Sequence, residues 1–146
     1  MRYTLLILIF SLGFSACTKD KFDTTPQIKI NNVNTTELHP GQILRFTIKY
    51  TDKEGDLQDS IYVQQFSANC PNTFFEQVYP LPDFPTTGNA EGEMEVSLGY
   101  RVQNYPSLRE PQCDVTDTCY FKFMLKDEAQ NRSDTITSEP IYLFKD

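Results

Sequence analysis

Acidic side chains gather in two short stretches of the sequence that have the composition of turns. The residues of these stretches are Asp52, Glu54, Asp56 and Asp59, and then Asp127, Glu128, Asn131 and Asp134. Hard oxygen donors of this kind bind Ca²⁺, which takes about six to eight oxygen ligands in a flexible shell. If folding brings the stretches together, the candidate calcium ligands are Asp52, Glu54, Asp56 and Asp127. The alternative is a pair of solvated turns that use Asp, Gly and Asn for backbone geometry.

Cysteines are the second group of residues that could do chemistry. Apart from Cys17 in the N-terminal segment, the chain has Cys70, Cys113 and Cys119, which allow at most one internal bridge in an oxidising compartment. Cys119 shares the alternation of the inward-facing residues after it, which favours a bridge from Cys119 to Cys113, with Cys70 as the alternative partner. The sequence has no C-x-x-C pair, and its one histidine, His39, lies in a turn. Neither a zinc site nor a catalytic cysteine is therefore favoured.

Several aromatic residues lie in proline-rich stretches that have no periodicity. They are Phe74, Phe75, Tyr79, Phe84 and Tyr105. One interpretation is that these side chains fold back as a small satellite core under long loops. The other is that they form an exposed apolar patch that binds a protein partner. Sugar binding is a further option, although tryptophan, the usual stacking platform for sugars, is absent from the chain.

Residues 1–16 have the composition of an export signal, with a basic end at Arg2 and an apolar run over Leu5–Leu12. That run is shorter than the ~20 residues that span a bilayer. The segment Phe14-Ser-Ala-Cys17 resembles the lipobox of bacterial lipoproteins, in which the leader is cut before an obligatory cysteine. The resemblance implies acylation of the thiol and the new amine of Cys17, and several acyl chains make a stable anchor. The alternative is a plain secreted protein with a spare thiol.

Residues 17–25 are polar and lack periodicity, which predicts a lipidated cysteine followed by a short tether. The lipoprotein resemblance implies attachment to the cell outer membrane. Lipoproteins of the Bacteroidota often carry charged residues just after the cysteine that direct surface display, and residues 18–21 match that pattern only in part. The periplasmic and the surface-exposed face of the membrane both stay open.

Strands must position these groups, because apolar residues alternate with polar ones along much of the chain. The alternating segments are Gln27–Val33, Ile43–Thr51, Ser60–Phe66, Gly92–Val102 and Cys119–Lys126. A short strand at Phe74–Val78 is expected at a sheet edge, because prolines surround it. Ser60–Phe66 is apolar on both faces, which predicts a central strand partly covered on both sides.

The last predicted strand, Asp134–Phe144, changes its alternation part-way. Its apolar side chains stand at Ile136 and then at Ile141 and Leu143, so even positions give way to odd ones. One extra residue in the pairing would produce this change, and we expect a β-bulge near residues 138–140.

About seven strands separated by turns predict an all-β, antiparallel sandwich of two sheets. The stretches YTDKEGDLQDSIYV and FMLKDEAQNRSDTITSEPIYL also resemble immunoglobulin-like and cadherin-like domains of bacterial surface lipoproteins. The resemblance covers Pro26 to Phe144 and implies one immunoglobulin-like domain over residues 26–146. In that fold order the two acidic turns emerge at the same end, where the first strand also begins. The acidic end should therefore lie nearest the membrane.

Composition and charge also disfavour several classes of function. The 146 residues carry a net charge of −7, which disfavours nucleic acid as a partner and adhesion of the domain surface to anionic lipid. No nucleophile elbow, phosphate-binding glycine loop or acid–base pair in a pocket is evident, so we expect no enzyme. The sequence predicts a membrane-anchored lipoprotein that binds a protein or serves as an accessory subunit in the envelope. The alternative is a glycan-binding module of a surface uptake system.

Overall fold

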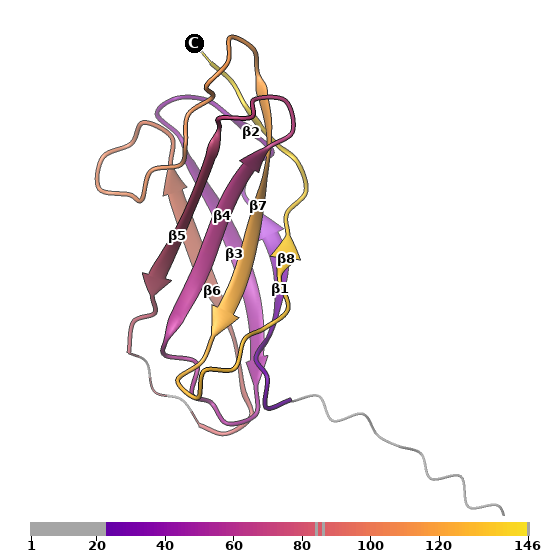
Figure 1. Cartoon of the computed structure of the whole chain (residues 1–146). Helices are drawn as coiled ribbons and strands as arrows, with labels where there is room; N and C mark the ends of the chain where they lie inside the picture. The colour runs from indigo at the N-terminus through magenta and orange to yellow at the C-terminus, as the bar shows by residue number, and fades with distance from the viewer. Residues whose placement is uncertain (1–22, 84, 86, 146) are drawn as a thin grey trace, which may run out of the picture.

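The computed structural model describes residues 23–83, 85 and 87–145, and this part of the chain contains nine strands and no helix (Figure 1). The strands are β1 (Gln27–Val33), β2 (Glu37–Leu38), β3 (Ile43–Asp52), β4 (Ser60–Ser67), β5 (Phe74–Pro80), β6 (Ala90–Gly99), β7 (Asp117–Lys126), β8 (Ile136–Thr137) and β9 (Ile141–Leu143). The predicted signal peptide, Cys17 and Phe84 lie outside the described residues, so the predictions about them stay predictions.

A three-stranded sheet is built around β3, in the order β1-β3-β6. Leu44, Phe46 and Ile48 alternate along β3 and are fully buried, as the period of two in the sequence requires. On the other face Lys49 pairs with Glu91 at 2.7 Å. This sheet therefore has one buried face and one charged face in water.

The second sheet has six strands in the order β2-β9-β7-β4-β5, with β8 also pairing with β7. Its strand β7 contributes Phe121, Phe123 and Leu125 to the core, all fully buried. The two sheets pack face to face (Figure 1), and the Phe46 ring centroid lies 5.2 Å from that of Phe121 and 4.9 Å from that of Phe123. The predicted all-β architecture of two packed sheets is confirmed.

Two details differ from the prediction. The described chain has nine strands rather than about seven, because β2 was not expected and the last predicted strand is divided into β8 and β9. The sheets are also not wholly antiparallel, since β2 pairs in parallel with β9. The N–H of Tyr142 donates to the Thr36 carbonyl at 2.7 Å, and the N–H of Phe144 donates to the Leu38 carbonyl at 2.9 Å. After β1 the chain crosses to the other sheet, and β2 runs beside the last strand there.

The predicted irregularity in the last strand is present between β8 and β9. In the register with β7, Thr137 lies opposite Lys122 and Ile141 lies opposite Cys119, so four steps on one strand match three on the other. Ser138 spans the gap, because its N–H donates to the Phe121 carbonyl at 2.8 Å and its hydroxyl accepts the Phe121 N–H at 3.0 Å. The change of alternation in the sequence is therefore caused by one extra residue between β8 and β9 relative to β7, as predicted.

Candidate functional sites

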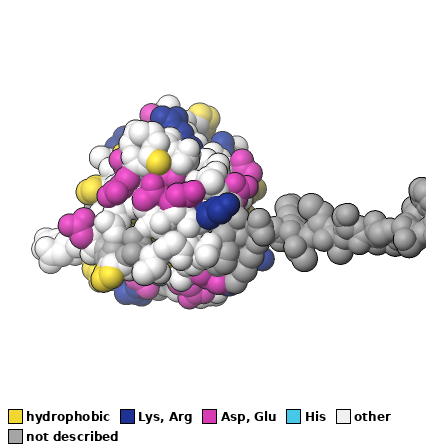
Figure 2. Space-filling model, turned by 90° about the horizontal axis from the view of Figure 1, so that it is seen from below, with side chains coloured by type: hydrophobic (Ala, Val, Ile, Leu, Met, Phe, Trp, Pro, Cys, Tyr) yellow, Lys and Arg dark blue, Asp and Glu magenta, His cyan; other side chains and the backbone are white. Residues whose placement is uncertain are grey.

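The two acidic turns lie together at the end of the molecule where the described chain enters β1. Carboxylate oxygens of Asp52, Asp56 and Asp127 lie within 4.8 Å of one another. The N–H of Glu128 donates to the Asp56 carbonyl at 2.9 Å, which joins the β3–β4 turn to the turn after β7. Seen from this end of the molecule, several acidic side chains lie on the surface (Figure 2). The structure therefore brings the two acidic stretches to one end.

The β3–β4 turn is shaped around the carboxylate of Asp52. Its Oδ2 accepts the N–H of Gly55 at 2.5 Å and the N–H of Asp56 at 3.3 Å. Gly55 has a φ of 76°, and a Cβ at this position would lie 2.4 Å from the carbonyl oxygen of Thr87. Only glycine fits such a turn without strain, so the glycine of the acidic stretch serves to place the carboxylates on either side of it.

The second turn holds Asp127 in a comparable way. One oxygen of its carboxylate accepts the N–H of Asn131 at 2.7 Å, and the other accepts the side-chain amide of Asn131 at 2.9 Å. Asp52 and Asp127 are both fully buried. Among the described residues, no lysine or arginine forms an ion pair with Asp52, Asp56 or Asp127. Three carboxylates thus share a small volume without a cationic side chain.

Two oxygens of this group have no hydrogen-bond partner. They are Oδ1 of Asp52 and Oδ1 of Asp56, and both atoms are buried. Burial is the main cause that raises the pKa of Asp52, and the neighbouring charges of Asp56 and Glu54 add to it. A buried carboxylate oxygen without a partner is costly, because it has lost its hydration and gained nothing in exchange.

The other residues of the acidic stretches are placed differently. Glu54, predicted as a fourth ligand, is exposed and lies outside the group of three. Asp59 accepts the hydroxyl of Ser60 at 2.6 Å and lies 3.7 Å from Lys126. Those two neighbours hold the pKa of Asp59 below its usual value, with the Ser60 hydrogen bond as the larger cause. Its charge is therefore already compensated.

The disulfide joins Cys70 to Cys113, whose Cα atoms are 5.6 Å apart. The prediction of a bridge from Cys119 to Cys113, or to Cys70, was wrong, since Cys119 is free and fully buried. The inward direction of its side chain, which favoured Cys119 as a partner, instead places the thiol in the core between the sheets. One internal bridge forms, as the odd number of thiols allowed.

The bridge also bears on the compartment in which the protein works. Disulfides persist in oxidising surroundings, so the Cys70–Cys113 bond indicates an extracellular or periplasmic protein. In the part of the chain that the structure describes, no helix has the length and apolar character needed to cross a membrane.

The aromatic residues singled out from the sequence do not form one platform. Phe74 and Phe75 are neighbours in β5 and therefore point to opposite faces of the sheet. Phe75 and Tyr79 pack against the core, whereas Phe74 is 46% exposed and Tyr105 is 38% exposed. Some of these residues therefore extend the core and others lie in water, while their binding of a partner stays a prediction.

A row of aromatic side chains crosses the outer face of the six-stranded sheet. By outer face we mean the side chains of β7, β4 and β5 that point away from the other sheet. The strand register places Phe66 directly between Tyr120 and Phe74. The rings of Phe66 and Tyr120 stack with centroids 5.4 Å apart and planes 19° apart. Among the described residues, no strand lies over this face (Figure 1).

A second apolar row lies further along the same strands. It places Tyr62 between Met124 and Val78, and Val78 is 59% exposed. A polar row separates the two. The hydroxyl of Tyr62 donates to Glu76 in that row at 2.7 Å, and Lys122 lies 4.7 Å from the centroid of the Phe66 ring. The outer face is thus an apolar surface interrupted by a few polar groups.

The outward apolar residues of β4 indicated this exposed face, but the prediction made from them was wrong. The apolar outer positions of β4, Tyr62 and Phe66, predicted a strand covered on both sides, but in the described chain no second layer covers them (Figure 1). The same outward parity recurs at Tyr120 and Met124 in β7, and at Phe74 in β5. Reading the three strands together would have predicted an exposed aromatic face.

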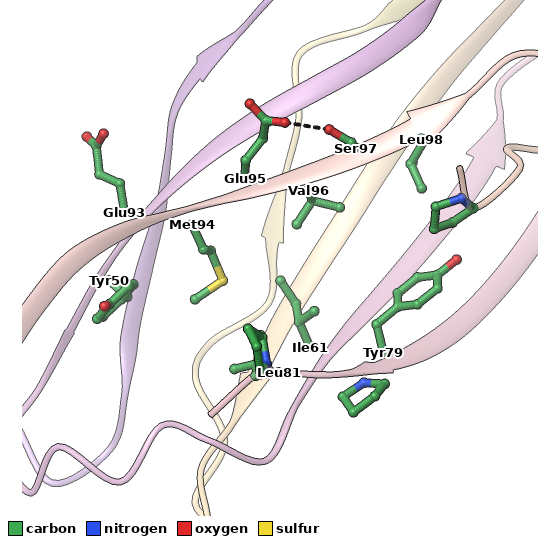
Figure 3. A pocket seen from close by; sticks show the side chains of 13 residues that line it. Tyr50, Ile61, Tyr79, Leu81, Glu93, Met94, Glu95, Val96, Ser97 and Leu98 are labelled. Atoms are coloured by element: carbon green, nitrogen blue, oxygen red, sulfur yellow. Dashed lines mark hydrogen bonds between the residues drawn. The ribbon is translucent and has the colours of Figure 1, made fainter. Parts of the chain in front are cut away.

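An apolar groove opens at the edge of the sandwich, between β5 of one sheet and β6 of the other (Figure 3). Its volume is about 590 Å³. Tyr79, Met94 and Val96 point into it, while Glu93 and Glu95 point away (Figure 3). Partial burial in this groove raises the pKa of Tyr79. The groove separates two edge strands, which explains why the core is open on this side.

Comparison with known proteins finds distant structural similarity. No protein-family model matches the sequence, and no curated protein matches it. Spo0M, a sporulation control protein from Bacillus subtilis, is similar with a TM-score of 0.49 and 10% identity over 84% of this chain, which spans 50% of Spo0M. A Niemann-Pick type C2 protein from the Japanese carpenter ant gives a TM-score of 0.46 and 8% identity, covering 86% of this chain and 98% of the ant protein. Likeness at this level carries no argument about function.

Proposed function

We propose that the protein is a non-enzymatic lipoprotein, anchored through Cys17 to the outer membrane, that binds another envelope protein through the outer face of its six-stranded sheet. The observation that carries the proposal is the uncovered aromatic row formed by Tyr120, Phe66 and Phe74. Exposed apolar patches rimmed by polar groups are typical of interaction sites. Support for the anchor comes from the lipobox resemblance and from a disulfide that suits an exported protein.

The charges around the outer face indicate the chemistry of the partner. Lys122 lies over the Phe66 ring, and Arg132 borders the shallow hollow beside Tyr62 and Val78. These basic groups are a local exception in a chain with a net charge of −7. Complementary charge at the rim favours correct partners and faster association. We therefore expect a protein whose contact surface has an apolar centre and carboxylates at its edge.

The alternative, a glycan-binding module of an uptake system, is less well supported by the geometry. A sugar ring needs the free face of an aromatic ring, but Phe66 stacks on Tyr120 and also has Lys122 over its ring. The aromatic residues predicted from the sequence are divided between the core and the surface. Protein contacts use the edges and bodies of aromatic side chains as well as their faces, so this arrangement suits a protein partner better.

Cross-linking followed by pull-down from detergent-solubilised membranes tests the proposal. We expect a partner recovered in stoichiometric amount with the wild-type chain, and at least ~10-fold less with Val78→Glu, because a charge in an apolar contact costs more than ~1.4 kcal/mol. Val115→Glu is the matched control, since Val115 is 56% exposed and Val78 is 59% exposed. The control should keep the partner.

Other results would count against the proposal. Equal recovery of the partner with Val78→Glu and Val115→Glu would place the contact elsewhere. Binding of the wild-type chain to surface polysaccharide, lost with Val78→Glu, would favour the glycan alternative. The anchor is tested separately by Cys17→Ser, which should move the protein from the membrane to the soluble fraction, and its persistence on membranes would contradict lipidation.

A further inference from the structure

We propose that Asp52, Asp56 and Asp127 bind one calcium ion, which joins the β3–β4 turn to the turn after β7. Asp52 and Asp56 belong to one turn and Asp127 to another, and these two turns are far apart in the sequence and meet only in the folded chain. This site shares no residue with the outer face of the six-stranded sheet, which is formed by side chains of β4, β5 and β7.

The spacing of the oxygens fits an ion of this size. Calcium lies about 2.3–2.6 Å from its ligands, so two ligands on opposite sides of the ion are roughly 5 Å apart. The carboxylate oxygens of Asp52, Asp56 and Asp127 lie within 4.8 Å of one another. This spacing is compatible with a single calcium ion that contacts all three carboxylates.

The unpartnered oxygens are a second, separate observation that points to a cation. Oδ1 of Asp52 and Oδ1 of Asp56 are buried and accept no hydrogen bond, and the side chain of Asp52 is fully buried. Oδ2 of Asp52 accepts two backbone N–H groups, and both carboxylate oxygens of Asp127 accept N–H donors of Asn131, which fixes the direction of the two side chains. Ordinary solvated turns would expose their carboxylates to water, so these turns are built differently.

The absence of a compensating side chain strengthens the argument. Among the described residues, no lysine or arginine pairs with any of the three carboxylates. Like charges at this separation repel strongly where little water screens them. A divalent cation removes that repulsion and satisfies both unpartnered oxygens, with water completing its shell.

The ligands favour calcium over other common divalent ions. All three are carboxylates, which suit hard cations, and no histidine or cysteine takes part. Magnesium requires a near-ideal octahedron at about 2.0–2.1 Å, so its opposite ligands are only about 4 Å apart. The larger and more tolerant shell of calcium matches carboxylates that are fixed by the backbone of two turns.

The ion would also fix the point where the chain enters the domain. The N–H of Lys53 donates to the Asp23 carbonyl at 3.0 Å, and the side-chain amide of Asn131 lies 3.4 Å from the Thr24 carbonyl. Both donors belong to the turns that carry the ligands. Binding of calcium should therefore order the residues just before β1 together with the two turns.

Calorimetric titration and thermal melting of the full chain, purified in mild detergent, test the site. With calcium chloride we expect one ion bound per chain and a rise in Tm of roughly 5–10 °C at saturating calcium, reversed by chelator. Asp56→Asn and Asp127→Asn should each abolish the rise. Asp56→Asn should also melt at a higher temperature than the wild type in chelator, because it removes one of the repelling charges.

Glu54→Gln is the matched control, since Glu54 lies in the same turn but is exposed and outside the group. It should keep the calcium-dependent rise in Tm. Absence of calcium binding to the wild type would overturn the proposal, and so would a calcium effect that survives Asp56→Asn. An equal effect of magnesium would overturn the choice of ion. Asp56 is only half-buried, so this variant tests the site even if Asp127→Asn fails to fold.

Discussion

At the scale of single residues, the thiol of Cys119 lies within 3.3 Å of the Gln65 amide nitrogen and of an Asp117 carboxylate oxygen. Asp117 in turn accepts the hydroxyl of Ser67, and Gln65 exchanges two hydrogen bonds with the backbone of Arg109. These residues therefore form a hydrogen-bonded polar network on the inner face of the six-stranded sheet. Every member has a partner, so the network specifies the packing here without leaving a reactive group.

Cys119 should be chemically inert in the folded protein. Burial, as the main cause, raises the pKa of Cys119 to about 12, and only the thiolate reacts with alkylating agents. At pH 8 we expect no labelling of Cys119 by iodoacetamide in the native chain. In denaturant without reductant, mass mapping should place the label on Cys119 and leave Cys70 and Cys113 unlabelled. Labelling of Cys70 instead would contradict the bridge between Cys70 and Cys113.

At the scale of the elements, the sequence predicted most of the strands because one face of each is buried. Alternation gave the bounds of β1 and β3 to within a residue, and β5 was correctly expected at a sheet edge. Alternation cannot reveal β2, since two residues have no period. It also could not show which faces stay uncovered, because that depends on whether a second layer exists.

The bulge between β8 and β9 depends on the hydroxyl of Ser138. Ser138→Ala would leave the buried N–H of Phe121 without an acceptor, and we expect a loss of about 1–3 kcal/mol in the free energy of unfolding. Urea denaturation measures this loss. Thr137→Ala is the control, because Thr137 is exposed in the same segment, and its effect should stay within about 0.5 kcal/mol. Equal losses in the two variants would contradict a role for the Ser138 hydroxyl.

At the scale of the whole molecule, β4 and β7 are held together at both ends. The Cys70–Cys113 bridge joins the loop after β4 to the loop before β7, and the acidic turns meet at the other end. The acidic end was predictable, because its residues stand out in the sequence and the resemblance to immunoglobulin-like domains implied that the two turns emerge at the same end. The disulfide partners were not, because pairing depends on where loops without periodicity cross in space.

Removal of the bridge should lower the stability of the whole domain. The cysteines are 43 residues apart, and closing a loop of that length stabilises the fold by about 4 kcal/mol in the chain-entropy model. The double variant Cys70→Ser, Cys113→Ser should therefore melt at least ~5 °C below the wild type. Reductant should lower the Tm of the wild type but not that of the variant. A Tm that reductant leaves unchanged in the wild type would refute this expectation.

The position of β1 has a mechanical consequence. It starts at the acidic end, where Gln27 lies opposite Thr51, and runs antiparallel to β3 as far as Val33. Ladder hydrogen bonds lie across the strands, so tension applied at Asp23 along the strand direction shears all of them at once instead of unzipping them singly. A load carried from the N-terminal side would thus be shared by the whole length of β1.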